Sequence, residues 1–124
     1  MIDFINPEYI KLTEMDQCKA EESVIELLRT EEKIEAAFRT VRDKVIFTSK
    51  RIITVNIQGA TGKRVDYTTL PYKKIQAFSI KTVALTDMDS ELNIWISNVG
   101  KIHFEIASGY DIKQLSKLLS QHVL

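Results

Sequence analysis

The stretch GATGKR, residues 59–64, has the residue types that come nearest to phosphate chemistry. A P-loop reads G-x-x-x-x-G-K-[ST] and leads into a helix, because backbone amides and the helix N-terminus together hold the phosphates. In this chain the glycines are three positions apart, Arg64 follows the lysine, and the next residues, VDYTTL, have the composition of a strand. The spacing therefore predicts a hairpin turn, in which glycine supplies positive φ angles.

A second group of residues that could do chemistry is basic. If these side chains gathered on one surface, they could bind an anionic lipid headgroup or another phosphorylated molecule. The candidate anion-binding residues are Lys44, Lys50, Arg51, Lys63 and Arg64. Lys50 and Lys63 stand at opposite ends of the strand expected between them, which argues against one continuous patch. Few aromatic residues for base stacking accompany them, so we expect no nucleic-acid partner.

The acidic residues, histidines and cysteine offer little for metal binding or catalysis. Asp87, Asp89 and Glu91 alternate like the start of a calcium loop, but an EF-hand needs glycine and glutamate where this chain has leucine and asparagine. His103 and His122 lack a Cys or His at ligand spacing, and no G-x-S-x-G motif is present. The sequence therefore predicts no metal, no cofactor and no enzymatic activity.

The composition is that of one soluble globular domain. The 124 residues are 44% hydrophobic and 27% charged, with 17 Lys plus Arg balancing 17 Asp plus Glu. Cys18 is the only cysteine, and it is interpreted either as a reactive thiol or as a small apolar residue on a helix. We find neither a signal peptide nor a run of about 18 apolar residues. A cytoplasmic protein without membrane insertion is expected, and peripheral membrane contact through basic residues remains the alternative.

The hydrophobic period divides the chain into two parts. Residues 15–29 have helical periodicity and neither Gly nor Pro, so they predict a helix that follows an irregular arm over residues 1–12. From residue 33 onward the period becomes two, as in RIITVNIQ and KIHFEIA, which is typical of antiparallel strands with one buried face. We therefore divide the chain into an N-terminal arm and helix, residues 1–30, and a main domain, residues 31–124.

The main domain is predicted to contain seven strands and one helix. The strands are expected near residues 33–41, 43–48, 51–58, 64–70, 74–82, 91–97 and 101–107, joined by short turns that favour hairpins. Ser108 and Asp111 resemble a capping box, and the leucines that follow form an apolar stripe. This C-terminal helix should cover an open end of a curled sheet.

Several apolar residues lie out of phase with the main buried face. Trp95, for example, alternates against Leu92, Ile94 and Ile96. Such a second apolar face can be covered by the N-terminal helix, by another subunit, or by both. The candidate interface residues are Val41, Ile46, Ile52 and Trp95. We expect a homo-oligomer, with a further protein partner whose identity is open.

The segment DKVIFTSKRIITVNIQGATGKRVDYTTLPYKKIQAFSI resembles the central block of the bacterial pleckstrin-homology (PH) domain family. The shared features are a short strand ending at Thr48, a tight turn to a basic residue and an apolar strand, a glycine-bearing hairpin, and a corner at residues 70–72. DMDSELNIWIS and the final helix also fit, so the resemblance covers roughly residues 30–124. It implies a PH-like seven-stranded antiparallel barrel or sandwich, capped by a C-terminal helix and preceded by an extra helix.

The resemblance also limits the function. It implies a family that is not known for enzymes and whose members form homo-oligomeric, often ring-like, assemblies. Because incomplete closure of the sheet leaves strand edges open, we hypothesise a non-enzymatic protein-interaction module that self-associates through strand edges and the second apolar faces. Lipid-binding relatives hold an inositol phosphate with a basic, roomy loop between the first two strands. Here that connection is only about Arg42-Asp43, followed by Lys44, and so short a loop cannot wrap a multiply phosphorylated ligand. Binding of an anionic ligand is therefore the alternative function.

Overall fold

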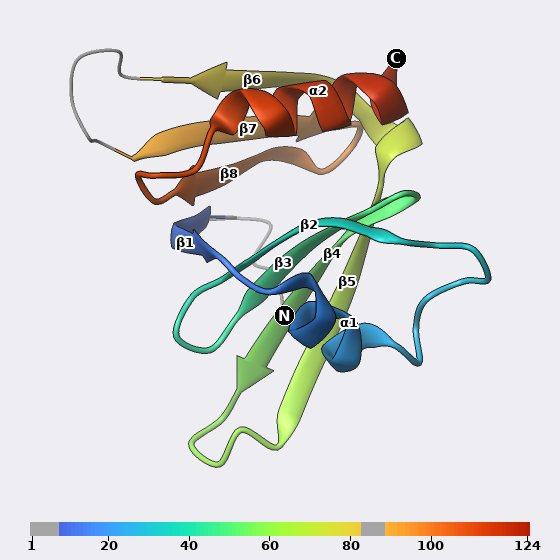
Figure 1. Cartoon of the computed structure of the whole chain (residues 1–124), viewed down its shortest axis with the longest axis vertical. Coiled ribbons are helices and arrows are strands. Elements are labelled where there is room, and N and C mark those ends of the chain that lie inside the picture. The colour runs from blue at the N-terminus through green and yellow to red at the C-terminus, as the bar shows by residue number, and fades with distance from the viewer. Residues whose placement is uncertain (1–7, 83–88) are drawn as a thin grey trace. The chain divides into compact units, whose positions relative to one another are not determined.

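The structure, a computed structural model, describes residues 8–82 and 89–124 and divides into two compact units. The first unit contains Glu14–Pro71, and the second contains Tyr72–Leu124 with the described part of Asp3–Thr13. In the described chain there are eight strands, two α-helices and one short 3₁₀ helix (Figure 1). Each unit is built around its own sheet and carries one α-helix.

The first unit is a helix packed on a four-stranded antiparallel sheet. Its strands are β2 (Ile34–Arg39), β3 (Lys44–Thr48), β4 (Arg51–Gln58) and β5 (Arg64–Pro71), paired in sequence order. These match the predicted strands, because alternating apolar residues and short turns favour hairpins between neighbours. In Figure 1 helix α1 (Gln17–Val24) lies against this sheet. β5 is the outermost strand.

Helix α1 covers one of the two apolar faces of this sheet. Ala20 and Val24 of α1 pack with sheet residues that include Ile46, Ile53 and Val55, and all of them are buried. The other face of the sheet is also apolar, with Phe38 and Phe47 in edge-to-face contact at 5.9 Å between ring centroids. Intrachain cover by the N-terminal helix, one of the two predicted alternatives, is therefore present for the α1 face.

Helix α1 is shorter than the predicted helix over residues 15–29. The Asp16 carboxylate caps it by accepting hydrogen bonds from the backbone N–H groups of Cys18 (2.8 Å) and Lys19 (3.2 Å). Cys18 lies on this helix, as one of its two interpretations expected, but it is exposed and so is not a buried apolar residue. The helix ends near Ile25, where the Leu27 N–H turns back to the Val24 carbonyl at 2.8 Å.

The second unit is a helix on a sheet that joins distant parts of the chain. Its order is β1 (Glu8–Glu14), β8 (Gly100–Ile106), β7 (Ser90–Ile96) and β6 (Ile75–Lys81). β6, β7 and β8 pair antiparallel, as predicted, and α2 (Ile112–Val123) packs on β6 and β7 through the stripe that includes Leu115 and Leu119. The short helix η1 (Tyr72–Lys74) leads into β6.

Two predictions for the second unit need correction. The arm expected to be irregular contributes an eighth strand, β1, which pairs parallel to β8 with a register shift between Tyr9 and Leu12. Helix α2 is capped by Asp111, whose carboxylate accepts from the Lys113 N–H at 3.1 Å, and not by Ser108. The Ser108 N–H instead donates to the Asp89 carboxylate at 3.0 Å, because that residue belongs to the preceding turn.

Candidate functional site

The outer edge of the first sheet is formed by β5. This strand pairs with β4 along its whole length, from Arg51 opposite Pro71 to Gln58 opposite Arg64. The sheet order of the described residues places no strand on the other side of β5. An unpaired edge of this kind presents backbone N–H and C=O groups that another strand can bind.

The hydrogen bonds identify which β5 residues present those groups. The Ile57 N–H donates to the Asp43 carboxylate at 3.2 Å, toward β3 and away from β5. Successive residues of an antiparallel strand turn their backbone groups to opposite sides, so the even-numbered residues of β4 bond to β5. The register then makes the even-numbered residues of β5 their partners. Val65, Tyr67 and Thr69 consequently direct their backbone groups outward, away from β4.

The side chains of the same three residues lie on the α1 face of the sheet. Tyr67 is opposite Val55, which packs in the core beneath α1, and side chains of directly opposed residues share a face. Val65 and Tyr67 are 40% and 46% exposed. The edge thus combines outward backbone groups with apolar side chains that remain accessible.

A groove lies beside this edge. Its volume is about 260 Å³, and it is bounded by the end of α1, by the residues that follow it and by Tyr67 of β5. The lining residues are Glu22, Ser23, Val24, Ile25, Glu26, Leu27 and Tyr67. Ile25 and Leu27 are large apolar residues that are 56% and 41% exposed. The groove therefore has a mixed lining of apolar side chains and two carboxylates, which suits contact with a second polypeptide.

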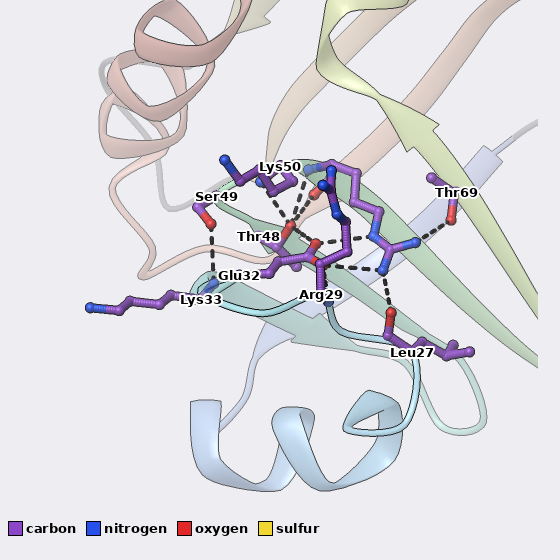
Figure 2. A network of polar contacts seen from close by, with 9 residues as sticks. Leu27, Arg29, Glu32, Lys33, Thr48, Ser49, Lys50 and Thr69 are labelled. Atoms are coloured by element: carbon purple, nitrogen blue, oxygen red, sulfur yellow. Dashed lines mark hydrogen bonds and ion pairs between the residues drawn. The ribbon is translucent and has the colours of Figure 1, made fainter.

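A buried ion pair fastens the segment that carries Leu27 to the sheet (Figure 2). The Glu32 side chain is fully buried, and the Arg51 guanidinium donates to both of its oxygens, at 3.0 Å from Nε and 3.1 Å from Nη2. Arg51 also donates to the Leu27 carbonyl at 2.6 Å and to Thr69 Oγ1 at 2.9 Å. One arginine thus joins β4, β5 and the residues after α1, and it fixes one end of the groove.

Further hydrogen bonds keep Glu32 ionised. The Thr48 hydroxyl donates to Oε2 at 2.5 Å, and the Arg29 N–H donates to Oε1 at 2.9 Å. Burial by itself raises the pKa of the Glu32 carboxyl, but the hydrogen bonds from Arg51, Arg29 and Thr48 and the charge of Arg51 together outweigh it. The pKa of Glu32 is therefore lowered, and the pair is charged at neutral pH.

The structure does not bring the five candidate anion-binding residues together. Arg51 is held by Glu32, and Lys50 lies beside it in the β3–β4 turn. Lys44, Lys63 and Arg64 lie toward the other end of the first sheet, where Lys44 pairs with Val55 and Arg64 pairs with Gln58. Because Val55 and Gln58 are three positions apart in one strand, the side chains of Lys44 and Arg64 point to opposite faces.

The GATGKR segment is a turn, as predicted. It joins the antiparallel strands β4 and β5, and both glycines have positive φ, +82° at Gly59 and +67° at Gly62. The Gly62 N–H donates to the Gly59 carbonyl at 3.2 Å. Arg42 Nη2 donates to that carbonyl as well, at 2.7 Å, so the cation binds the turn itself.

The candidate interface residues occupy different environments. Val41 is 98% exposed in the β2–β3 turn, and Trp95 is half-buried with Lys101 Nζ at 6.0 Å from its ring centroid. Ile46 and Ile52 are fully buried, at 0% exposure, because they fill opposite faces of the first sheet. In this conformation those two side chains belong to the core, so of the four predicted interface residues Val41 and Trp95 are the ones that remain accessible.

The titratable residues of the second unit form a structural cluster. His103 Nδ1 lies 2.7 Å from Asn93 Oδ1, its Nε2 lies 3.4 Å from the Glu91 carboxylate, and both partners are on the neighbouring strand. The pKa of Glu105 is raised, first by burial and then by a hydrogen bond and charge repulsion from Asp89. The charges of His103 and Lys11 act in the opposite direction and lower it, but by less.

His122, near the C-terminus, stacks on Tyr72 with 4.8 Å between ring centroids. Within the described ranges no three His, Cys, Asp or Glu side chains gather as a metal site, and Asp87 lies outside those ranges. The same residues include no helix long and apolar enough to cross a membrane.

The β5 edge and its groove were not among the predicted site residues. VDYTTL gave a strand signal, with Val65 and Tyr67 on one face, but alternation is the same for edge and inner strands. Ile25 and Leu27 were assigned to a helix, where an apolar stripe is expected to be buried. The apolar residues continue beyond the point where α1 ends, and this continuation is the signal that could have indicated that Ile25 and Leu27 are exposed.

Comparisons with known proteins agree on the family. The family model described as "Bacterial PH domain" matches residues 3–123. The uncharacterized protein YjqA of Bacillus subtilis (strain 168) is 44% identical over 100 residues, which cover 77% of this chain and 80% of that protein.

Two crystal structures from Shewanella are also similar. A DUF1696 family protein with a pleckstrin-homology domain from Shewanella loihica PV-4 is 32% identical, with a TM-score of 0.81 over 93% of this chain and 99% of that one. A pleckstrin homology domain from Shewanella amazonensis SB2B is 36% identical, with a TM-score of 0.68 over 90% and 91% of the two chains.

Proposed function

Since this chain belongs to the bacterial PH domain family and has a PH-like fold, we propose that it is a non-enzymatic protein-interaction module that self-associates through the β5 edge. We define the β5 edge as Val65, Tyr67 and Thr69 together with Ile25 and Leu27. The observation that carries the proposal is the combination at one place of outward backbone groups, exposed apolar side chains and a groove.

Strand addition explains why each of these features is useful. A second strand alongside β5 satisfies the outward N–H and C=O groups, which gives affinity without regard to sequence. Side chains at alternate positions of the added strand then contact Tyr67 and the groove, which gives selectivity. Equal numbers of cationic and anionic residues, 17 of each, leave no net charge to drive two copies apart.

The proposal places the module in the cytoplasm. Its only cysteine, Cys18, is exposed on α1, where a free thiol is stable in a reducing compartment. The two sheets are stabilised by apolar cores and hydrogen bonds, with no role for a disulfide.

Two matched substitutions test the proposal and the earlier interface prediction together. Val65→Lys places a charge on the β5 edge, and Val41→Lys makes the same change at the exposed candidate residue of the β2–β3 turn. A charged residue at a sheet edge opposes pairing with another strand. We expect sedimentation velocity over a series of concentrations to show self-association of the wild-type chain and of Val41→Lys, and a weaker association of Val65→Lys.

The possible results separate the hypotheses. A wild-type chain that stays monomeric at every concentration contradicts self-association. If Val41→Lys dissociates the assembly and Val65→Lys does not, the interface lies at the Val41 turn and not at the β5 edge.

A further inference from the structure

Three carboxyl groups meet at one end of the β7–β8 pair in the second unit. Glu105 of β8 is half-buried and stands directly opposite Glu91 of β7 in the antiparallel register. Asp89, which immediately precedes β7, comes close enough to the Glu105 carboxyl to share a hydrogen bond with it. Like charges at opposed positions of a strand pair are destabilising. A proton on Glu105, or a cation beside it, relieves this repulsion.

Asp89 also holds the corner that leads from β8 into α2. Its Oδ1 accepts a hydrogen bond from the Ser108 N–H at 3.0 Å. Ser108 lies between the end of β8 and Asp111, the residue that caps α2. Because an ionised carboxylate accepts at both oxygens, Asp89 can accept from Ser108 and from a protonated Glu105 at the same time. A protonated Glu105 therefore joins β8 to the residue that holds this corner.

On its other side Glu105 has a cation of β1 as a neighbour. Strand β8 lies between β7 and β1 in the sheet order. Tyr9 and Leu12 of β1 pair with residues 104 and 106, so Lys11 lies at the level of Glu105. Lys11 is exposed and has no ion-pair partner within the described ranges, and its charge favours the ionised form of Glu105. Glu105 thus stands between an acid on one neighbouring strand and a base on the other.

We propose that Glu105 is a proton-operated switch between Asp89 and Lys11. When protonated, its carboxyl donates a hydrogen bond to Asp89 and strengthens the corner before α2. When ionised, it leaves Asp89 and pairs with Lys11 of β1. The switch lies within the second unit and does not depend on self-association of the chain.

The other charged groups around Glu105 already have positions of their own. The Glu91 carboxylate lies 3.6 Å from Lys81 Nζ of β6 and 3.4 Å from His103 Nε2 of β8. Glu8 of β1 stands opposite His103 in the parallel register, two residues before the level of Glu105. Glu91 therefore keeps two partners whichever neighbour Glu105 binds, and the exchange involves the acid before β7 and the lysine of β1.

The pH at which the switch operates follows from the direction of the pKa shift. Burial first, and then Asp89, raise the pKa of Glu105 in the folded chain. Such a group contributes its full stabilisation below its unfolded-state pKa, about 4.3 for glutamate, and loses it as the pH rises through the folded-state pKa. The corner is therefore held most firmly in acid and is released toward neutral pH. The contribution of Glu32 has the opposite pH dependence, because its pKa is lowered.

An NMR titration of the full chain from acid to neutral pH tests the switch without a substitution. The side-chain carboxyl carbon of Glu105 should change its chemical shift at a higher pH than in the urea-unfolded chain. The Ser108 amide should show a step at the same midpoint, because its acceptor loses the neighbouring proton. Glu105→Gln stays neutral and keeps a donor for Asp89, so this variant should lack the step at Ser108.

Two substitutions should move the midpoint of Glu105 in opposite directions. Asp89→Asn removes the neighbouring negative charge and keeps an oxygen acceptor, so Glu105 should titrate at a lower pH. Lys11→Met removes the cation that favours the ionised form, so Glu105 should titrate at a higher pH. Lys81→Met is the charge-matched control, since Lys81 is an exposed lysine of the same sheet with a different partner. It should shift the midpoint by less than Lys11→Met does.

Hydrogen exchange of the Ser108 amide measures the release of the corner. After correction for the intrinsic rise of exchange with pH, its protection should fall across the Glu105 transition in the wild-type chain and stay constant in Glu105→Gln. Constant protection in the wild-type chain would show that the corner is not released. An unchanged midpoint in Asp89→Asn, or equal shifts in Lys11→Met and Lys81→Met, would show that Glu105 does not exchange these two partners, and the proposal would be overturned.

Discussion

Removal of the Arg51 side-chain charge tests how the segment after α1 is held to the first sheet. Arg51→Met keeps much of the side-chain volume but leaves the fully buried Glu32 carboxylate without its counterion. Loss of one partner of a buried ion pair costs about 3–5 kcal/mol, because the remaining charge is desolvated and unpaired. The whole free energy of unfolding of a 124-residue chain is about 6–19 kcal/mol, so the loss is large.

The assay is urea unfolding at neutral pH, with a matched control on an exposed ion pair. Lys81 Nζ lies 3.6 Å from a Glu91 carboxylate oxygen, and the Lys81 side chain is 71% exposed. Lys81→Met should cost less than about 1 kcal/mol, as exposed pairs do. Arg51→Met should shift the midpoint to a lower urea concentration by several times as much.

A double-mutant cycle with Glu32→Gln then isolates the interaction. Once the buried charge is gone, loss of Arg51 leaves no unpaired carboxylate, so the double variant should be more stable than the sum of the single losses predicts. We expect a coupling free energy of about 0.5–3 kcal/mol. If Arg51→Met costs no more than Lys81→Met, the pair does not fasten the segment, and the reasoning is refuted.

Three further outcomes follow from the same geometry. Because the pKa of Glu32 is lowered in the folded chain, its contribution to stability is complete above the unfolded-state pKa of about 4.3 and is lost as the pH falls through the folded-state pKa. Acid titration followed by circular dichroism should therefore destabilise the wild-type chain more steeply than Glu32→Gln. Ile46→Ala should lower the free energy of unfolding by about 2–5 kcal/mol in urea, because Ile46 is fully buried, while the self-association of its folded form, measured by sedimentation, stays unchanged. Gly62→Ala should lower the free energy of unfolding by about 1–2 kcal/mol, since φ is +67° and the new methyl group would lie 3.4 Å from Ile57. Gly62→Asn should lower it by less in the same urea melts, because asparagine tolerates positive φ. Equal losses for the two Gly62 variants would contradict that explanation.

Alternation of apolar residues was sufficient to predict the seven strands of the main domain. In β8 every second side chain enters a core, so the period of two is uninterrupted, whereas in β4 the four consecutive residues 52–55 are all buried. Strand β1 escaped prediction because its buried residues, Tyr9 and Leu12, are three positions apart. A register shift lies between them, and Lys11 has a φ of +57°, so the local pattern resembles neither a regular strand nor a helix.

The end of α1 depends on contacts that no local pattern reveals. Leu27 and Arg29 are good helix formers, and intrinsic propensity alone would continue the helix through them. In the fold, Arg51 binds the Leu27 carbonyl and Glu32 binds the Arg29 N–H, which are backbone groups that helical hydrogen bonds would otherwise use. A tertiary hydrogen bond from Arg51 and a local one to Glu32 therefore end the helix, and Ile25 and Leu27 stay exposed.

The candidate site was predicted least well, for a physical reason. Exposure of Val65 and Tyr67 follows from the position of β5 at the edge of its sheet, which is a property of strand order and not of local sequence. Burial of Ile46 and Ile52 on opposite faces likewise follows from the presence of cover on both faces of the first sheet. A single sequence shows which residues alternate, but it does not show which faces and edges are occupied.

Amide hydrogen exchange measured by NMR at low and high protein concentration tests self-association at the β5 edge most directly. Asp66 and Thr68 bond to β4, so their amides should be protected at every concentration. The amides of Val65 and Tyr67 face outward, and they should exchange rapidly in dilute solution and slowly when the chain is concentrated. If they exchange equally fast at all concentrations while another segment becomes protected, the interface lies elsewhere and the proposal is contradicted.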